Sequence, residues 1–321
     1  MLKDLLLKDN VMPGLIKDLK KNFLYFLMLS FVFISSFSFI GIDNQNRINL
    51  PIFAKNDEKV FADLPKLKDE SSFPIVSAQA ALIVDLNSGV TLYEKDADKK
   101  LLPASTTKII TALVAMEYYP LDKVLTVGRI NVEGQKMGLV YGERISVNDL
   151  LYGLLVYSAN DAAEVLAQSY LGGRDGFIFA MNAKAKELYL TNSYFSNPSG
   201  LDGNGHYSTA RDLVRVSWVA MKNPLFSEIV ATKEKTVKSE DGKIVHKLTN
   251  INKLLDEKEG ILGVKTGWTE EARENLVTYI NKDKKRILIA ILGSQDRFGE
   301  TKELIDWTFD NYEWEKVSYP L

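Results

Sequence analysis

The sequence predicts a mixed α+β (α/β) fold in which one antiparallel sheet is built from both chain ends and covered by helices. Strand-like segments separated by turn residues stand near both ends of the folded part, and segments with helical periodicity lie between them. Strands and helices must bury their apolar faces on one another, so the two ends are expected to share a single sheet. The intervening helices are expected to form a helical subdomain.

Two hairpins are predicted to supply the strands. The first turns at Asn87-Ser88-Gly89 and the second at the polar segment 281–285. Apolar residues on either side of these turns define the strands 80–85, 90–94, 276–280 and 286–292. Each hairpin therefore contributes two antiparallel neighbours to the sheet.

Helical spacing of apolar residues predicts the elements between the hairpins and one element after them. The segments are 107–119, 147–157, 161–170, 174–190, 209–222 and 301–312. Ser146 precedes the second segment and stands three residues before Asp149, which is the spacing of a capping box. Ser146 is therefore expected to begin that helix rather than to do chemistry.

Composition excludes several classes of protein. The formal net charge of −2 comes from 40 basic and 42 acidic residues, so the 321-residue chain has no basic field for nucleic acid. The absence of cysteine excludes disulfides, thiolate catalysis and cysteine-based zinc sites. The two histidines, His206 and His246, are too few and too separated in sequence for a histidine metal cluster.

A run of twenty uncharged residues, 23–42, matches the length of a bilayer crossing and follows three lysines within residues 17–21. Lysines on that side predict a single-pass span in the cell membrane, with the N-terminus in the cytoplasm. The small-x-small site at 36–38 (SFS) leaves open a signal peptide whose cleavage would secrete the protein. Either way, the folded part is expected to be extracytoplasmic.

The remaining boundaries follow from composition. Residues 1–22 are expected to be a short cytoplasmic segment. Residues 43–75 mix charges and prolines with few periodic apolar positions, which predicts a mobile tether. The folded domain is expected to span residues 76–315, followed by a tail at 316–321.

Ser105-Thr106-Thr107-Lys108 is the only Ser-x-x-Lys tetrapeptide in the chain, and it stands just past Pro103 at the head of a predicted helix. A serine hydroxyl becomes a good nucleophile when a neighbouring base takes its proton. Side chains three residues apart share one face of a helix, so Lys108 is within reach of the Ser105 oxygen. Taken alone, however, a serine at a helix start is more often a cap than a catalyst.

A second motif, Ser158-Ala159-Asn160-Asp161, lies between two predicted helices. A hydroxyl and an amide two residues apart in a turn both face a cleft, where Ser158 is suited to relay a proton and Asn160 to hold a substrate carbonyl. Residues 146–149 have the same pattern at a helix start, so this signal is weak by itself.

The third motif, Lys265-Thr266-Gly267, occurs once and leads through Trp268 toward the strand at 276–280. Lys and Thr side chains at a strand edge suit an anionic group, and a glycine lets a substrate approach the backbone closely. An ordinary glycine-containing edge strand is the structural alternative.

Together, the order Ser-x-x-Lys, Ser-x-Asn, Lys-Thr-Gly is the motif set of penicillin-binding proteins and class A β-lactamases. The chain resembles low-molecular-weight penicillin-binding proteins of the D-alanyl-D-alanine carboxypeptidase family, peptidase family S11. Within about residues 78–312, the segments that carry the resemblance are LLPASTTKIITALVA, MGLVYGERISVNDLLYGLLVYSANDAAEVLA, FSNPSGLDGNGHYSTARDL and GVKTGWT. The resemblance implies a β-lactamase/transpeptidase-like fold.

The resemblance also implies serine acyl transfer on peptidoglycan pentapeptide stems that end in D-Ala-D-Ala, with β-lactams as covalent inhibitors. Ser105 would attack the penultimate D-Ala carbonyl with Lys108 as base, and Ser158 would pass a proton to the leaving amine. Lys108 must then lose its proton easily, which burial or the field of Lys265 would cause. No metal or organic cofactor is needed.

By the same resemblance, the other motif residues would bind substrate. Asn160 would bind the substrate amide, and Lys265 with Thr266 would hold the terminal carboxylate beside Gly267. The backbone N–H groups of Ser105 and Trp268 would form the oxyanion hole.

The sequence also departs from the family pattern. Relatives often have an Ala-Gly pair where this chain has Ala272-Arg273-Glu274, and some have a basic residue at Ile251. Arg297 is expected either to help bind a carboxylate or to make a structural salt bridge. His206 is expected to be structural, with lining of the site as the alternative, and His246 is expected to be a surface strand residue.

Three other functions fit some of these features. A D,D-endopeptidase that cuts cross-links shares all three motifs. A β-lactamase would also need fast deacylation, for which no dedicated glutamate is identified. A membrane-tethered β-lactam sensor or wall-binding module would be acylated without turnover, but the segment before Phe23 is too short for a signalling domain.

Overall fold

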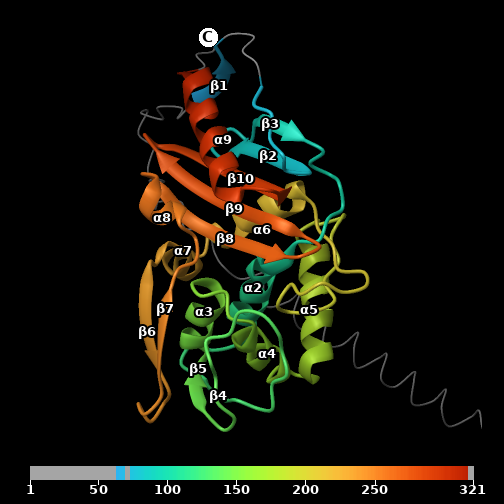
Figure 1. The fold of residues 1–321 in the computed structure, drawn as a ribbon, viewed down its shortest axis with the longest axis vertical. Coiled ribbons are helices and arrows are strands. Elements are labelled where there is room, and N and C mark those ends of the chain that lie inside the picture. Colours follow the sequence, from blue (N-terminus) through green and yellow to red (C-terminus); the bar gives the residue numbers. More distant parts are fainter. Residues whose placement is uncertain (1–62, 69–72, 317–321) are drawn as a thin grey trace, which may run out of the picture. The chain divides into compact units, whose positions relative to one another are not determined.

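The computed structural model describes residues 63–68 and 73–316 (Figure 1). The expected cytoplasmic segment, the uncharged run 23–42 and residues 317–321 lie outside these residues. Within them, no helix is both long and apolar enough to cross a bilayer. A membrane span at 23–42 therefore stays a prediction.

Both ends of the folded chain meet in one five-stranded antiparallel sheet with the order β3-β2-β10-β9-β8 (Figure 1). Its strands are β2 (Ala80–Asp85), β3 (Thr91–Lys95), β8 (Ile261–Thr269), β9 (Arg273–Lys282) and β10 (Lys285–Ser294). Leu82 pairs with Ala290, which joins the first hairpin to the last. The predicted fold class and both hairpins are confirmed, and β8 adds an edge strand that carries the third motif.

The longer helices follow the predicted segments within a few residues. They are α2 (Lys108–Tyr118), α3 (Val147–Leu155), α4 (Asn160–Gln168), α5 (Gly173–Glu187), α6 (Ala210–Met221) and α9 (Arg297–Asn311). The capping box at Ser146 is confirmed, because the Ser146 hydroxyl accepts from the Asp149 backbone N–H at 3.1 Å. α9 begins four residues earlier than predicted because Asp296 caps it through the Gly299 N–H.

Short elements complete the described fold, and the sequence did not predict them. They are the 3-10 turn η1 (Ala104–Thr107), α7 (Pro224–Ala231), α8 (Leu254–Glu257) and the strand pairs β4 (Val124–Thr126) with β5 (Arg144–Ser146) and β6 (Glu234–Lys238) with β7 (Val245–Thr249). Each of these four strands carries a single buried apolar residue, so apolar alternation could not reveal them.

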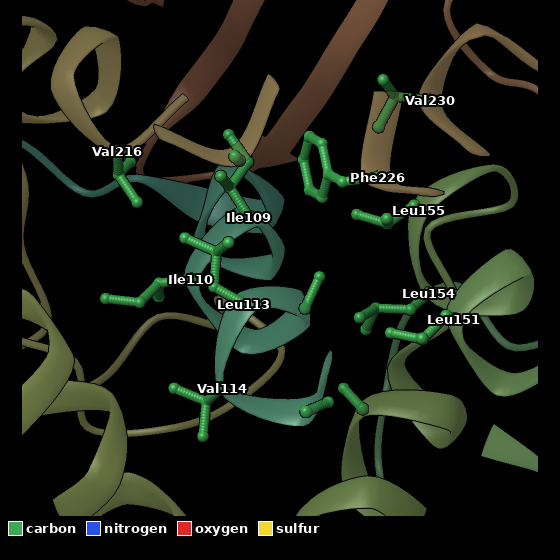
Figure 2. Close-up of a cluster of buried hydrophobic side chains, with 14 of the residues drawn as sticks. Ile109, Ile110, Leu113, Val114, Leu151, Leu154, Leu155, Val216, Phe226 and Val230 are labelled. Atoms are coloured by element: carbon green, nitrogen blue, oxygen red, sulfur yellow. The ribbon is translucent and has the colours of Figure 1, made fainter. Parts of the chain in front are cut away.

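Two apolar cores lie on opposite faces of the sheet. Alternate residues of β10 separate them: Leu288 and Ala290 belong to the larger core, whereas Ile287 and Ile289 belong to the smaller core under α9. In the larger core, α2 is surrounded by apolar side chains of α3, α6 and α7 (Figure 2). The helix that follows Ser105 is therefore held on several sides.

The expected tether is wrong in its last part. Asp63–Leu67 forms strand β1, which pairs antiparallel with β11 (Tyr312–Lys316), so the folded part also extends one residue past the expected boundary. Leu67 lies opposite Tyr312 in this pair and packs on the smaller core. The partner strand lies at the other end of the chain, so local composition could not show this pairing.

Candidate active site

Ser105 lies in η1, immediately before α2 begins at Lys108. The Lys108 Nζ and Ser105 Oγ atoms are 2.8 Å apart, as the spacing predicted. Neither η1 nor α2 has a side-chain cap, so Ser105 does not cap a helix. Its hydroxyl is instead exposed to a cleft and paired with a lysine.

Two glycines allow other segments to reach the backbone of this turn. A Cβ at Gly267 would lie 3.1 Å from the Ser105 backbone nitrogen, and a Cβ at Gly200, whose φ is +87°, would collide with the Ala104 carbonyl oxygen. Strand β8 and the loop at 197–201 can therefore pack directly on the turn that carries Ser105.

Lys108 is fully buried, and its amino nitrogen is within hydrogen-bond distance of three oxygen atoms. Its Nζ lies 2.8 Å from Ser105 Oγ, 2.6 Å from Asn160 Oδ1 and 2.5 Å from the Ser199 carbonyl oxygen. Burial lowers the pKa of Lys108 to about 7, although the negative charge of Asp161 opposes this shift. A neutral Lys108 donates to two of these oxygens and offers its lone pair to the Ser105 hydroxyl proton.

A second lysine–serine pair forms across the site. Lys265 of β8 donates to Ser158 Oγ at 2.8 Å and to the Thr266 carbonyl oxygen at 3.0 Å. Burial, followed by the positive charges of Lys108 and Arg297, lowers the pKa of Lys265 well below its ordinary value. Ser158 has a φ of +61°, an uncommon value for a serine, and this conformation faces its hydroxyl toward β8.

Asn160 and Asp161, at the start of α4, organise one wall. The Asn160 side chain donates to the Glu133 carbonyl oxygen at 2.7 Å while its Oδ1 accepts from Lys108. The Asp161 carboxylate accepts from the backbone N–H groups of residues 137, 138 and 139. Sequence reasoning gave Asp161 no role, because these contacts join segments that are separate in the sequence.

One cleft of about 1230 Å³ connects these groups. The residues of the three motifs that line it are Ser105, Ser158, Asn160, Thr266, Gly267 and Trp268. Lys108 and Lys265 are buried behind its wall. Thr266 Oγ1 is buried and has no hydrogen-bond partner among the described residues, so a hydroxyl donor is free for a ligand.

The three sequence motifs therefore meet in one cleft, and comparison with known proteins places the chain in a family. The model of the Peptidase S11 family, described as D-alanyl-D-alanine carboxypeptidase, matches residues 68–296. The chain belongs to this family.

Individual S11 relatives agree with this assignment. The chain is 31% identical to the D-alanyl-D-alanine carboxypeptidase DacF of Bacillus subtilis, over 81% of this chain and 67% of DacF. It is 35% identical to a D-alanyl-D-alanine endopeptidase of Pseudomonas aeruginosa, over 72% of this chain and 77% of that protein. The crystal structure of the Streptomyces K15 DD-transpeptidase superposes with a TM-score of 0.71 at 31% identity, covering 75% of this chain and all of the other.

Arg297 of this S11 peptidase lines the cleft from the first turn of α9. Its Nη1 donates to the Gly267 carbonyl oxygen at 2.9 Å, and burial lowers its pKa from the ordinary value. No carboxylate lies within ion-pair distance of its guanidinium among the described residues. The structural salt bridge, one of the two roles expected for Arg297, is therefore not seen among the described residues. Ile251 also lines the cleft.

The two histidines are both buried and neither lines the cleft. His206 lies 2.8 Å from the Thr107 hydroxyl, and burial with the charge of Lys108 lowers its pKa to about 4, so it is neutral. The expectation of a surface position for His246 is wrong: its Nε2 lies 2.7 Å from a Glu143 carboxylate oxygen. That partner is distant in the sequence, which is why the alternation of β7 did not reveal it.

Two asparagines that sequence reasoning gave no role also position the S11 site. Asn197 Oδ1 accepts from the backbone N–H groups of Ser199, Gly200 and Leu201. This fixes the loop whose Ser199 carbonyl oxygen holds Lys108. Asn275 of β9 donates to the Leu102 carbonyl oxygen at 2.9 Å, just before the Ser105 turn. In the sequence, Asn197 lies in FSNPSGLDGNGHYSTARDL, one of the segments that resemble the family, and this resemblance could have indicated its role.

Proposed function

We propose that this protein is a serine D-alanyl-D-alanine carboxypeptidase that removes the terminal D-Ala from peptidoglycan stem peptides through a Ser105 acyl-enzyme. The observation that carries the proposal is the Ser105–Lys108 contact of 2.8 Å at the cleft, with the pKa of Lys108 near 7. A base with such a pKa takes and returns a proton efficiently at neutral pH.

In acylation, Ser105 Oγ attacks the carbonyl carbon of the penultimate D-Ala while Lys108 takes the hydroxyl proton. The oxyanion lies against the backbone N–H groups of Ser105 and Trp268, donors of a kind whose removal typically costs about 2.7–4 kcal/mol of barrier. The C–N bond then breaks as Ser158 gives its proton to the departing D-Ala amine and takes one from the Lys108 ammonium, which restores the neutral base. Attack of water on the ester, with Lys108 again as base, releases the shortened peptide.

The substrate's terminal carboxylate binds at the β8 side of the cleft. The free Thr266 hydroxyl and the Arg297 guanidinium both line this side. Lys265 is buried immediately behind them, where the negative charge of a carboxylate would favour its ammonium form. Three donors around one position support the proposal of a substrate with a free C-terminal carboxylate.

The test is D-Ala release from diacetyl-Lys-D-Ala-D-Ala, with fluorescent penicillin labelling in parallel. We expect steady release and labelling from the wild type and neither from Ser105→Ala, whose folding is checked by thermal melting. Unchanged release by Ser105→Ala would exclude the mechanism. Labelling without release would indicate a β-lactam sensor, and rapid penicillin hydrolysis would indicate a β-lactamase.

An endopeptidase is the second candidate, because the Pseudomonas aeruginosa endopeptidase is about as similar to this chain as the carboxypeptidases are. The same preparation is therefore assayed on cross-linked muropeptide dimers. A higher kcat/KM on the dimer than on the pentapeptide would favour the endopeptidase.

We propose that a membrane span at residues 23–42 tethers the enzyme outside the cytoplasm. Twenty uncharged residues preceded by lysines support this. The protein is expected in the membrane fraction with its N-terminus intact. A soluble mature protein that starts near Phe39 would instead establish a cleaved signal peptide.

A further inference from the structure

The cleft continues past the catalytic groups along one face of α4. Asn160, Glu164 and Gln168 are spaced by four residues, and all three line the cleft. Four residues of α-helix rise about 6 Å, so Glu164 stands about 6 Å and Gln168 about 12 Å from Asn160 along the helix axis. The proposed mechanism uses only the Asn160 end of this face.

An ion pair in the middle of this face leaves some of its hydrogen-bonding atoms without a partner in the described part of the chain. Arg174 of α5 donates through Nε to Glu164 Oε2 at 3.0 Å. The Glu164 side chain is 8% exposed and the Arg174 side chain 41% exposed. Glu164 Oε1 and the two terminal nitrogens of Arg174 make no hydrogen bond with the described residues. The pair therefore offers one acceptor and several donors to the cleft.

A second arginine stands at the far end of the same face. Gly128 packs against Gln168, whose Oε1 would lie 3.2 Å from a Cβ at that glycine, so the next residue, Arg129, borders the end of α4. Arg129 is exposed, lines the cleft and has no ion-pair partner among the described residues. Glu133 also lines the cleft, but its carbonyl oxygen binds Asn160, which places it nearer the catalytic end.

Building on the proposed function, we infer that Glu164, Arg174 and Arg129 bind the side chain of the stem peptide's third residue, and that they select a diamino dicarboxylic acid such as diaminopimelate over lysine. The third residue's Cα lies about 3.8 Å from that of the acylating D-Ala. A side chain of several methylenes that runs along α4 brings its end to Glu164 and beyond.

Charge distinguishes the two substrates. Both side chains carry an ammonium group that suits Glu164 Oε1, but only the diamino dicarboxylic acid also carries a carboxylate. Arginine binds carboxylates with paired hydrogen bonds, and two arginines border this end of the cleft. A lysine side chain would leave both arginines without an anion and would meet their positive charge.

The experiment compares two tripeptides, N-acetyl-X-D-Ala-D-Ala, in which X is lysine or meso-diaminopimelate with its side-chain end free. The wild type is expected to show a kcat/KM for D-Ala release about tenfold or more higher on the diaminopimelate peptide. Arg129→Gln and Arg174→Gln are each expected to reduce this ratio, and the double variant to bring it near one. Arg215→Gln, which changes an exposed arginine of α6 outside the cleft, should keep the wild-type ratio.

Binding of the same two peptides to Ser105→Ala, measured by calorimetry, gives the ratio without turnover. If neither peptide releases D-Ala but this protein still prefers diaminopimelate, the proposed function fails and the subsite stands. A wild-type ratio near one in both measurements, or a ratio that the double arginine variant retains, would overturn the subsite whether or not the enzyme turns over.

Discussion

Two lysine–serine pairs meet in this cleft with the same contact distance and different surroundings. Lys108 and Ser105 are three residues apart at one helix start, whereas Lys265 and Ser158 come from a strand and a turn between helices. In both pairs, Nζ lies 2.8 Å from Oγ and the lysine is buried. Contact geometry alone would therefore give both pairs the same chemistry.

The charges around the two lysines separate their roles. Asp161 counteracts burial at Lys108 and leaves its pKa near 7, whereas Lys265 faces the positive charges of Lys108 and Arg297, which lower its pKa further. Lys108 is thus suited to exchange a proton at neutral pH. At Lys265, burial and two neighbouring cations disfavour the charged form, and an anion such as a substrate carboxylate would favour it.

Removing the first lysine should have the largest effect. Lys108→Gln leaves Ser105 without a base, so acylation by penicillin should slow about 10³-fold or more. Stopped-flow labelling measures this rate, and Lys184→Gln, which breaks a surface ion pair of α5, is the control. If acylation slows less than tenfold in Lys108→Gln, a group other than Lys108 is the base.

The serine of the second pair has a matched control in the chain. Ser158→Ala removes the proton relay, so D-Ala release should fall about 10²-fold. Ser146 has the same Ser-x-Asn-Asp pattern but caps α3, so Ser146→Ala should keep the activity and lose about 1 kcal/mol of unfolding free energy. Equal activity losses in the two variants would show that the effect is structural.

The pH dependence of acylation tests the role of Lys108. Its pKa is lowered to about 7, so the base form accumulates as pH rises through 7. The acylation rate should therefore fall about tenfold per pH unit below 7 and level off above it. Burial rather than Lys265 sets this value, so Lys265→Gln should keep the inflection near pH 7. A rate that is flat between pH 5.5 and 8.5 would contradict the assignment.

Local patterns predicted much of this molecule. The hairpins and long helices carry their own periodicity and turns, and the Ser105–Lys108 contact follows from an i, i+3 spacing. The order of three motifs then placed Ser158 and Lys265 in one site before any contact between them was visible.

Contacts between distant segments were beyond local patterns. The Asp161 carboxylate accepts hydrogen bonds from backbone groups more than twenty residues away. His246 is buried against Glu143, which lies in the turn before β5. The strand β1 is visible only through its pairing with β11. In each case a polar or charged residue looks like a surface residue until its partner is known.

The smallest expected effect concerns Thr266, next to the second lysine. Thr266 and Thr278 both have a buried hydroxyl without a partner among the described residues, but only Thr266 lines the cleft. Replacing either with valine should leave thermal stability nearly unchanged, because no internal hydrogen bond is lost. Thr266→Val alone should raise KM for a peptide with a free C-terminus about tenfold, since it removes one hydrogen bond to a carboxylate. The peptide amide, which lacks that charge, should show little change. A KM effect of equal size in Thr278→Val, or on the amide, would show that the Thr266 hydroxyl does not bind the carboxylate.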